Sequence, residues 1–180
     1  MPVNRNIYAA PERSILLNIE RTILNGTILS VMASTLLVAA LRFNPRLFLQ
    51  DYPEDIQNQA PPQTDQEKKQ SLLVGIPFLI LLAAVPLIST LALKRQGGEE
   101  VSFLQLFLNA FGVVFIFNLV DLLLLDWLIF CFITPQFIVI PGTEGMAGYK
   151  DYFFHFRAFL KGTVLSTAAG LVIAGIVLLL

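Results

Sequence analysis

The sequence predicts an all-α, polytopic membrane protein with four transmembrane helices. Apolar residues make up 56% of the 180 positions and charged residues only 14%, with a mean hydropathy of +0.71. Soluble domains carry about 25% charged residues. A bilayer core requires about 20 consecutive apolar residues from each helix that crosses it. Four runs meet this requirement, at residues 23–41, 72–93, 103–133 and 158–180.

The chain is predicted to consist of an N-terminal segment, residues 1–22, and a four-helix transmembrane domain, residues 23–180. The first segment is expected to be helical because Pro11 and Glu12 suit the first turn of a helix. Residues 43–70 are rich in Pro, Gln and Asp, a composition typical of an exposed, mobile polar loop. Residues 134–156 are expected to form an interfacial loop, because their aromatic side chains favour the headgroup level.

Composition also excludes several classes of function. The formal net charge of −1 argues against nucleic-acid binding, which requires a basic face to neutralise phosphates. Cys131 is the only cysteine, so neither an internal disulfide nor a C-x-x-C redox motif is present. The lipid bilayer is therefore the first expected partner, and no cofactor is predicted.

The third run contains polar residues where hydrocarbon is expected. It begins at Ser102, which forms a predicted capping box with Gln105. At 100° per residue, Asn118, Asp121 and Asp126 fall within one arc of about 140°. That arc must face protein or water, because an unpaired carboxylate in hydrocarbon costs at least about 2.5 kcal/mol.

Two basic residues at the start of the fourth predicted helix are candidate partners for these carboxylates. Lys161 is expected at the same depth as Asp126, which favours a pair between them, with Arg157 as the alternative. Asp121 lies deeper, with no basic residue level with it, and is expected to be protonated or in contact with water. One interpretation is a structural pair between helices, and the other is a proton or cation relay.

His155 lies among aromatic residues, four positions after Asp151, and could hydrogen-bond to it along one helix face. Both are candidate interfacial residues. A zinc site would require three or four N, S or O ligands, and a haem an additional strong axial ligand. Neither set is visible, and no catalytic residue or metal ligand is assigned.

Small residues recur at intervals of four in the first and fourth runs, a spacing that lets helix backbones approach closely. Whether these faces meet within the chain, in a homo-oligomer or on a protein partner is left open by the sequence. The two series are Gly26, Ser30 and Ser34, and Gly162, Ser166, Gly170 and Ala174.

The segments DWLIFCFITPQFIVIPGTEG and GYKDYFFHF, in the C-terminal third, resemble small multi-span membrane proteins of bacteria. The resemblance implies a bacterial cell membrane as the location, and it carries no established activity.

Three functions remain open at this point. The packing faces and the lack of a catalytic constellation favour a non-enzymatic accessory subunit or scaffold of a membrane complex. The alternative is proton- or ion-coupled transport or permeation through Asp121 and Asp126. A second alternative is an interfacial lipid-modifying enzyme built from Asp126, His155, Arg157 and Lys161.

Overall fold

The computed structural model describes residues 9–180, with side chains from residue 18 onward. Residues 1–8 of the predicted N-terminal helix lie outside the described residues. Four long helices are present, each apolar and long enough to cross a membrane, which confirms the predicted fold class. They are α1 (Ala9–Phe43), α3 (Asp65–Gly97), α4 (Phe103–Val120) extended by the π-helix η3 (Asp121–Ile133), and α5 (Tyr152–Leu179).

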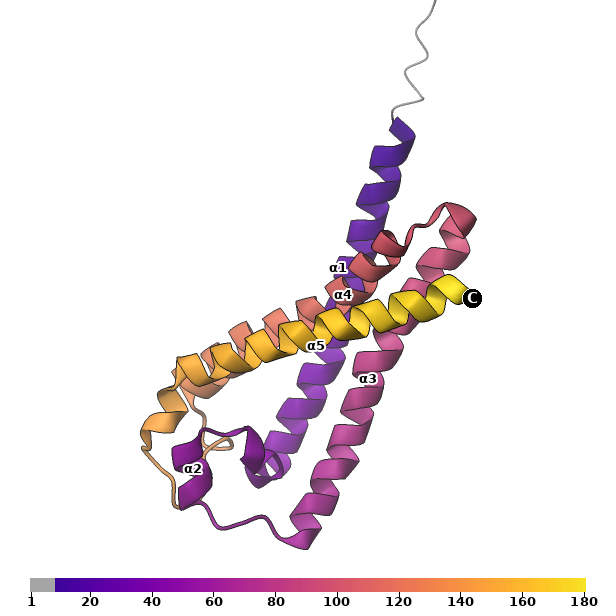
Figure 1. Cartoon of the computed structure of the whole chain (residues 1–180). Helices are drawn as coiled ribbons and strands as arrows, with labels where there is room; N and C mark the ends of the chain where they lie inside the picture. Colours follow the sequence, from indigo (N-terminus) through magenta and orange to yellow (C-terminus); the bar gives the residue numbers. More distant parts are fainter. Residues whose placement is uncertain (1–8) are drawn as a thin grey trace, which may run out of the picture.

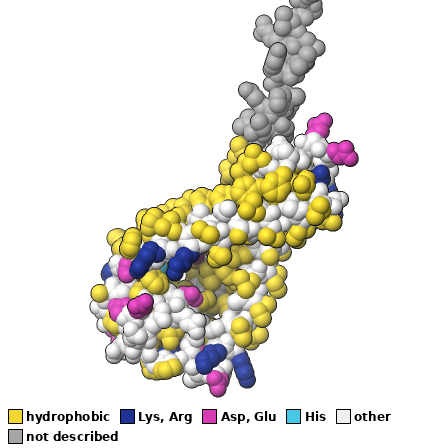
Figure 2. Space-filling view, in the orientation of Figure 1, with side chains coloured by type: hydrophobic (Ala, Val, Ile, Leu, Met, Phe, Trp, Pro, Cys, Tyr) yellow, Lys and Arg dark blue, Asp and Glu magenta, His cyan; other side chains and the backbone are white. Residues whose placement is uncertain are grey.

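The long helices form two pairs that cross, with α4 at the centre (Figure 1). Helix α4 runs beside α5 and packs against α1 and α3, whereas α3 meets α5 only toward one end. Hydrophobic side chains cover the helices in Figure 2, and charged side chains gather at the two ends. This distribution fits a multi-pass membrane protein in contact with lipid.

The two small-residue faces pack on α4 from different sides. A Cβ atom at Gly26 of α1 would lie 2.8 Å from the Ile116 side chain, and one at Gly170 of α5 would lie 3.1 Å from the Phe111 backbone nitrogen. Ser30 and Ser166 each donate a hydrogen bond of 2.7 Å back to the carbonyl four residues earlier. Both faces are therefore used inside the chain to seat helices on α4.

The other members of the two series differ in their surroundings. Gly162 approaches the side chain of Asn118, and Ala174 is fully buried. The hydroxyl of Ser34 is buried without a hydrogen-bond partner among the described residues.

The segment predicted as an exposed, mobile polar loop is instead part of a folded cap, so that expectation was wrong. It contains the 3-10 helix η1 (Pro45–Asp51) and the α-helix α2 (Glu54–Gln59). These pack against residues 134–151, which include the short helix η4 (Ala147–Lys150). Sparse apolar side chains, hidden by the polar composition, form its core: Leu49, Tyr52, Ile56, Ala60, Phe130, Cys131, Ile138, Ile140 and Tyr149.

Buried hydrogen bonds join the two halves of the cap. The Tyr52 hydroxyl donates to the Ile138 carbonyl at 2.8 Å, and the Gly148 N–H donates to Asp55 at 2.9 Å. Lys150 donates from Nζ to the Cys131 and Phe132 carbonyls at 2.6 and 3.2 Å. These carbonyls lie in the last turn of η3, where backbone acceptors lack partners within the helix. The cap therefore completes the end of the third membrane helix.

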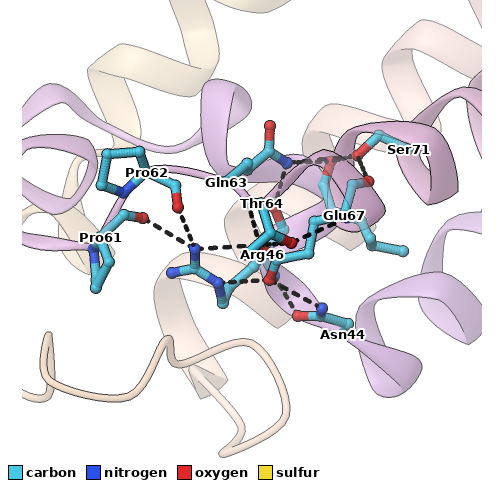
Figure 3. A network of polar contacts seen from close by, with 9 residues as sticks. Asn44, Arg46, Pro61, Pro62, Gln63, Thr64, Glu67 and Ser71 are labelled. Atoms are coloured by element: carbon cyan, nitrogen blue, oxygen red, sulfur yellow. Dashed lines mark hydrogen bonds and ion pairs between the residues drawn. The ribbon is translucent and has the colours of Figure 1, made fainter.

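A second network fastens the cap to the start of α3 (Figure 3). Arg46 of η1 forms an ion pair with Glu67 at 2.6 Å and donates to the Pro61 and Pro62 carbonyls at 2.9 and 3.0 Å. Glu67 also belongs to the capping box that begins α3. The predicted capping box of Ser102 and Gln105, at the start of α4, is confirmed.

The seating of α5 on α4 gives a testable prediction. Gly170→Leu should lower the free energy of unfolding by about 1–3 kcal/mol, because the backbone of α4 cannot move aside. The matched control is Gly175→Leu, because a Cβ there would have no neighbour within 4 Å. Thermal unfolding in detergent measures both, and an equal loss in the two variants would contradict the close seating.

Candidate functional site

Asp121 and Asp126 lie on neighbouring turns of one face of η3. In a π-helix each backbone N–H bonds to the carbonyl five residues earlier. The N–H of Thr134 donates to the Ile129 carbonyl at 2.9 Å in this register. Five residues also separate the two aspartates, so the π register brings them closer together around the helix axis than an α register would. The predicted α-helical arc of about 140° was therefore wrong for this stretch.

Asp126 pairs with His155 of α5. The Asp126 Oδ1 atom lies 3.0 Å from His155 Nδ1. The two predicted pairs, Asp126 with Lys161 and Asp151 with His155, are not formed. Lys161 lies exposed on α5 instead of meeting Asp126, and Asp151 accepts a hydrogen bond of 2.8 Å from the Phe154 N–H as the N-cap of α5. The first turn of α5 therefore points its histidine, not a lysine, at η3.

The imidazole of His155 is enclosed by aromatic rings. It is 4% exposed, and its ring centroid lies 4.7 Å from that of Phe130 and 5.3 Å from that of Phe154, both edge to face. Its Nε2 atom is buried and has no hydrogen-bond partner among the described residues. A buried polar atom without a partner costs about 1–3 kcal/mol, so this nitrogen calls for an explanation.

Two further carboxylates surround the pair. The charges of Asp126 and Asp51 both act on Asp121, and the charge of Asp126 reaches Asp51 at the end of η1. Loss of contact with water, and then the charge of Asp126, raises the pKa of Asp51 above its ordinary value of 3.8. The site therefore draws on the cap as well as on η3 and α5. No group of three His, Cys, Asp or Glu side chains among the described residues is placed to hold a metal ion.

The other predicted members of the intramembrane cluster lie apart from this site. Asn118 donates from Nδ2 to the Phe159 carbonyl and to the Thr163 hydroxyl, both at 3.1 Å, and so links α4 to α5. The guanidinium of Arg157 lies 5.1 Å from the centre of the Phe153 ring. The five predicted residues therefore do not form one cluster. Asn118 links two helices, Arg157 and Lys161 lie at the surface, and Asp121 and Asp126 lie at the His155 site.

A second polar centre, which the sequence analysis missed, ties three helices together at the opposite end. Asn109 of α4 is 5% exposed and accepts a hydrogen bond of 2.8 Å from Thr22 of α1. It donates to Ser89 and Thr90 of α3, both at 3.0 Å. Asn25 of α1 also donates to Ser89, at 2.9 Å. An asparagine in the middle of the run FLQLFLNAFG was the signal available in the sequence.

A dry layer separates the two polar centres. Leu29 and Ala33 of α1 and Val113 and Phe117 of α4 form one buried cluster, at 0–6% exposure. No polar side chain interrupts this cluster within the described part of the chain. The His155 site and the Asn109 centre are therefore two separate sites along the helix formed by α4 and η3.

No protein-family model, no curated protein and no solved structure matches this chain. The geometry of the two polar centres is therefore the basis on which function is argued.

The raised pKa of Asp51 gives a prediction with a defined pH dependence. A carboxyl whose pKa is higher in the folded state lowers stability at neutral pH, and this cost disappears as pH falls to the unfolded value. Asp51→Asn should therefore raise the melting temperature at pH 7 but not at pH 3. As a control, Asp65→Asn should show no gain at either pH, since that side chain is 95% exposed. A gain of equal size at both pH values would contradict the assignment.

Proposed function

We propose that this polytopic membrane protein binds and releases protons at the Asp126–His155 pair, and that it is the proton-binding unit of a coupled transport process. The observation that carries the proposal is the buried, unpartnered Nε2 atom of an imidazole whose Nδ1 atom faces a carboxylate. Histidine is the side chain whose ordinary pKa lies between pH 5 and 8.

The geometry suits reversible protonation. A carboxylate at Nδ1 favours the tautomer with the proton on Nδ1, which leaves the lone pair of Nε2 free to accept a second proton. The carboxylates of Asp126 and Asp121 then stabilise the imidazolium.

Protons reach the pair from the cap side. The side chain of His155 is 6% exposed, whereas that of Asp126 is 23% exposed and faces the surroundings. The dry layer around Val113 and Phe117 blocks continuous passage toward the far side. Under this proposal transfer across the membrane requires the dry layer to open.

The same geometry argues against a lipid-modifying enzyme. Such a reaction would bring Asp126, His155 and the cations of α5 together around one substrate. Arg157 instead stacks on Phe153, and Lys161 lies exposed, so neither cation pairs with a carboxylate of the site.

Proton uptake in liposomes tests the proposal. With the purified protein and an imposed pH gradient, Asp126→Asn and His155→Gln should each reduce proton flux by about a hundredfold or more, the usual scale for removing a proton-transfer group. Asp151→Asn is the matched control because asparagine is an equally good N-cap, and its flux should equal that of the unmodified protein. Flux unchanged in both Asp126→Asn and His155→Gln would refute the proposal.

The local chemistry can be measured separately. The chain contains a single histidine, so every imidazole nitrogen resonance belongs to His155. In ¹⁵N-labelled protein the Nδ1-protonated tautomer should dominate, and Asp126→Asn should give a mixture of tautomers.

A second candidate function, an accessory subunit of a membrane complex, is favoured by one observation. In the most apolar stretch of α3 only 6% of residues are buried, against 28% in each of the other three long helices. The small-residue faces of α1 and α5 already pack against α4. The uncovered surface of α3 is therefore where another membrane protein or a second copy would bind.

Affinity purification from native membranes checks this second candidate. If α3 is a docking face, one stoichiometric partner should co-purify and be lost on Leu73→Arg, whose side chain is 72% exposed. Leu165→Arg on α5, 69% exposed, is the control and should retain it. A protein that purifies alone from its own membranes would exclude the subunit function.

A further inference from the structure

Two adjoining cavities lie at the end of the helices opposite to His155, beside the Asn109 centre. The first, of about 80 Å³, is lined by polar side chains of α1, α3 and α4. The second, of about 250 Å³, is largely apolar and opens between α1, α3 and α4. Asn18, Leu93 and Asn109 line both cavities, so the two lie side by side.

The polar cavity has the donors that an anionic group requires. Arg21, Asn25, Ser89 and Gln96 line it together with the shared asparagines. The side chains of Arg21 and Gln96 make no hydrogen bond or ion pair with any other residue that the structure describes. A guanidinium binds phosphate oxygens in a bidentate manner.

The carboxylates at this end of the molecule stay outside the polar cavity. Glu20, Glu99 and Glu100 are exposed, and none of them lines it. The cavity therefore presents one cation and several amides, with no carboxylate to repel an anion.

The apolar cavity suits a hydrocarbon chain. Ile19, Ile23 and Leu108 line it and are 50%, 52% and 52% exposed on the membrane-facing surface. Pockets for whole small molecules hold about 300–1,000 Å³, so 80 Å³ admits only a group of phosphate size. A polar cavity for a headgroup joined to an apolar groove for a chain matches the shape of a phospholipid.

The expected depth of the two cavities in the membrane also fits a phospholipid. Lys94 and Arg95 lie in the last turn of α3, directly before Gln96, and basic side chains at helix ends reach toward lipid headgroups. We infer that the cavities formed by Arg21, Gln96 and Asn109 with Ile23 and Leu108 bind one anionic phospholipid, its phosphate at Arg21 and an acyl chain along the groove. This site is independent of proton binding at His155.

Native mass spectrometry of the full chain in detergent, titrated with dioleoyl phosphatidylglycerol, tests the inference. One lipid should bind before all others. Arg21→Gln should weaken this binding by about tenfold or more, the scale of one charge-assisted contact. Leu108→Trp should weaken it similarly by filling the groove.

Each variant has a matched control. Arg157→Gln removes an exposed arginine at the opposite end, and Leu104→Trp enlarges an exposed leucine of α4 that does not line the groove. Both should bind the lipid as the unmodified protein does. Equal weakening in Arg21→Gln and Arg157→Gln would show general charge attraction and overturn the inference.

Free inorganic phosphate distinguishes the two sources of the anion. If phosphate alone displaces the lipid and Leu108→Trp binds normally, the occupant is a free anion and the lipid assignment is wrong. If Arg21→Gln fails to fold, as judged by circular dichroism, Leu108→Trp and Arg21→Lys decide the same question, because lysine keeps the charge and loses the bidentate geometry.

Discussion

The requirement that polar groups find partners within the protein governs this structure. In a bilayer core no water is available to them, and each unsatisfied group costs several kcal/mol. Asn118 and Asn109 meet the requirement by bonding to neighbouring helices. Lys150 meets it for the carbonyls at the end of η3. Against this background the unpartnered Nε2 of His155 is an exception, and unsatisfied buried groups call for a functional explanation.

The cap, the π-helix and the His155 site form one unit. The π register begins at Asp121 and ends at Ile133, where Lys150 of the cap binds the last carbonyls. The same cap buries Phe130, whose ring stacks edge to face on the imidazole of His155. Removing the cap would therefore leave the last carbonyls of η3 without their hydrogen bonds to Lys150 and would expose the imidazole of His155. The polar loop between the first two membrane helices thus has a structural role at the site.

Periodic features of the sequence predicted much of the fold. Four long apolar runs, two series of small residues and the Ser102 capping box depend on spacing along a regular α-helix, and all of them are present in the structure. The depth of a polar residue in an apolar run is also local information, and it singled out Asp121 and Asp126 as residues expected to need partners.

What the sequence could not predict depends on departures from regular geometry or on contacts between distant segments. A switch to π register leaves no composition signal, yet it changes which residues share a face. The Asp126–His155 pair depends on the rotation of α5, which is fixed by Gly162 and Gly170 against α4. The cap core uses few apolar residues within a polar segment, so composition alone suggested an exposed loop.

The hydrogen-bond register of η3 also connects the proposed chemistry to the helix that passes both polar centres. An α register over the same residues would separate Asp121 and Asp126 by about 140° around the helix axis. The carboxylates would then lie farther apart around the axis, and the direction of Asp126 relative to His155 would change. Asn109 fixes the other end of α4 to α1 and α3. A change of register in η3 would therefore shift the residues in between, which include Val113 and Phe117 of the dry layer. Under the proposed function that layer would have to open for a proton to cross, and the π register would then link protonation to access.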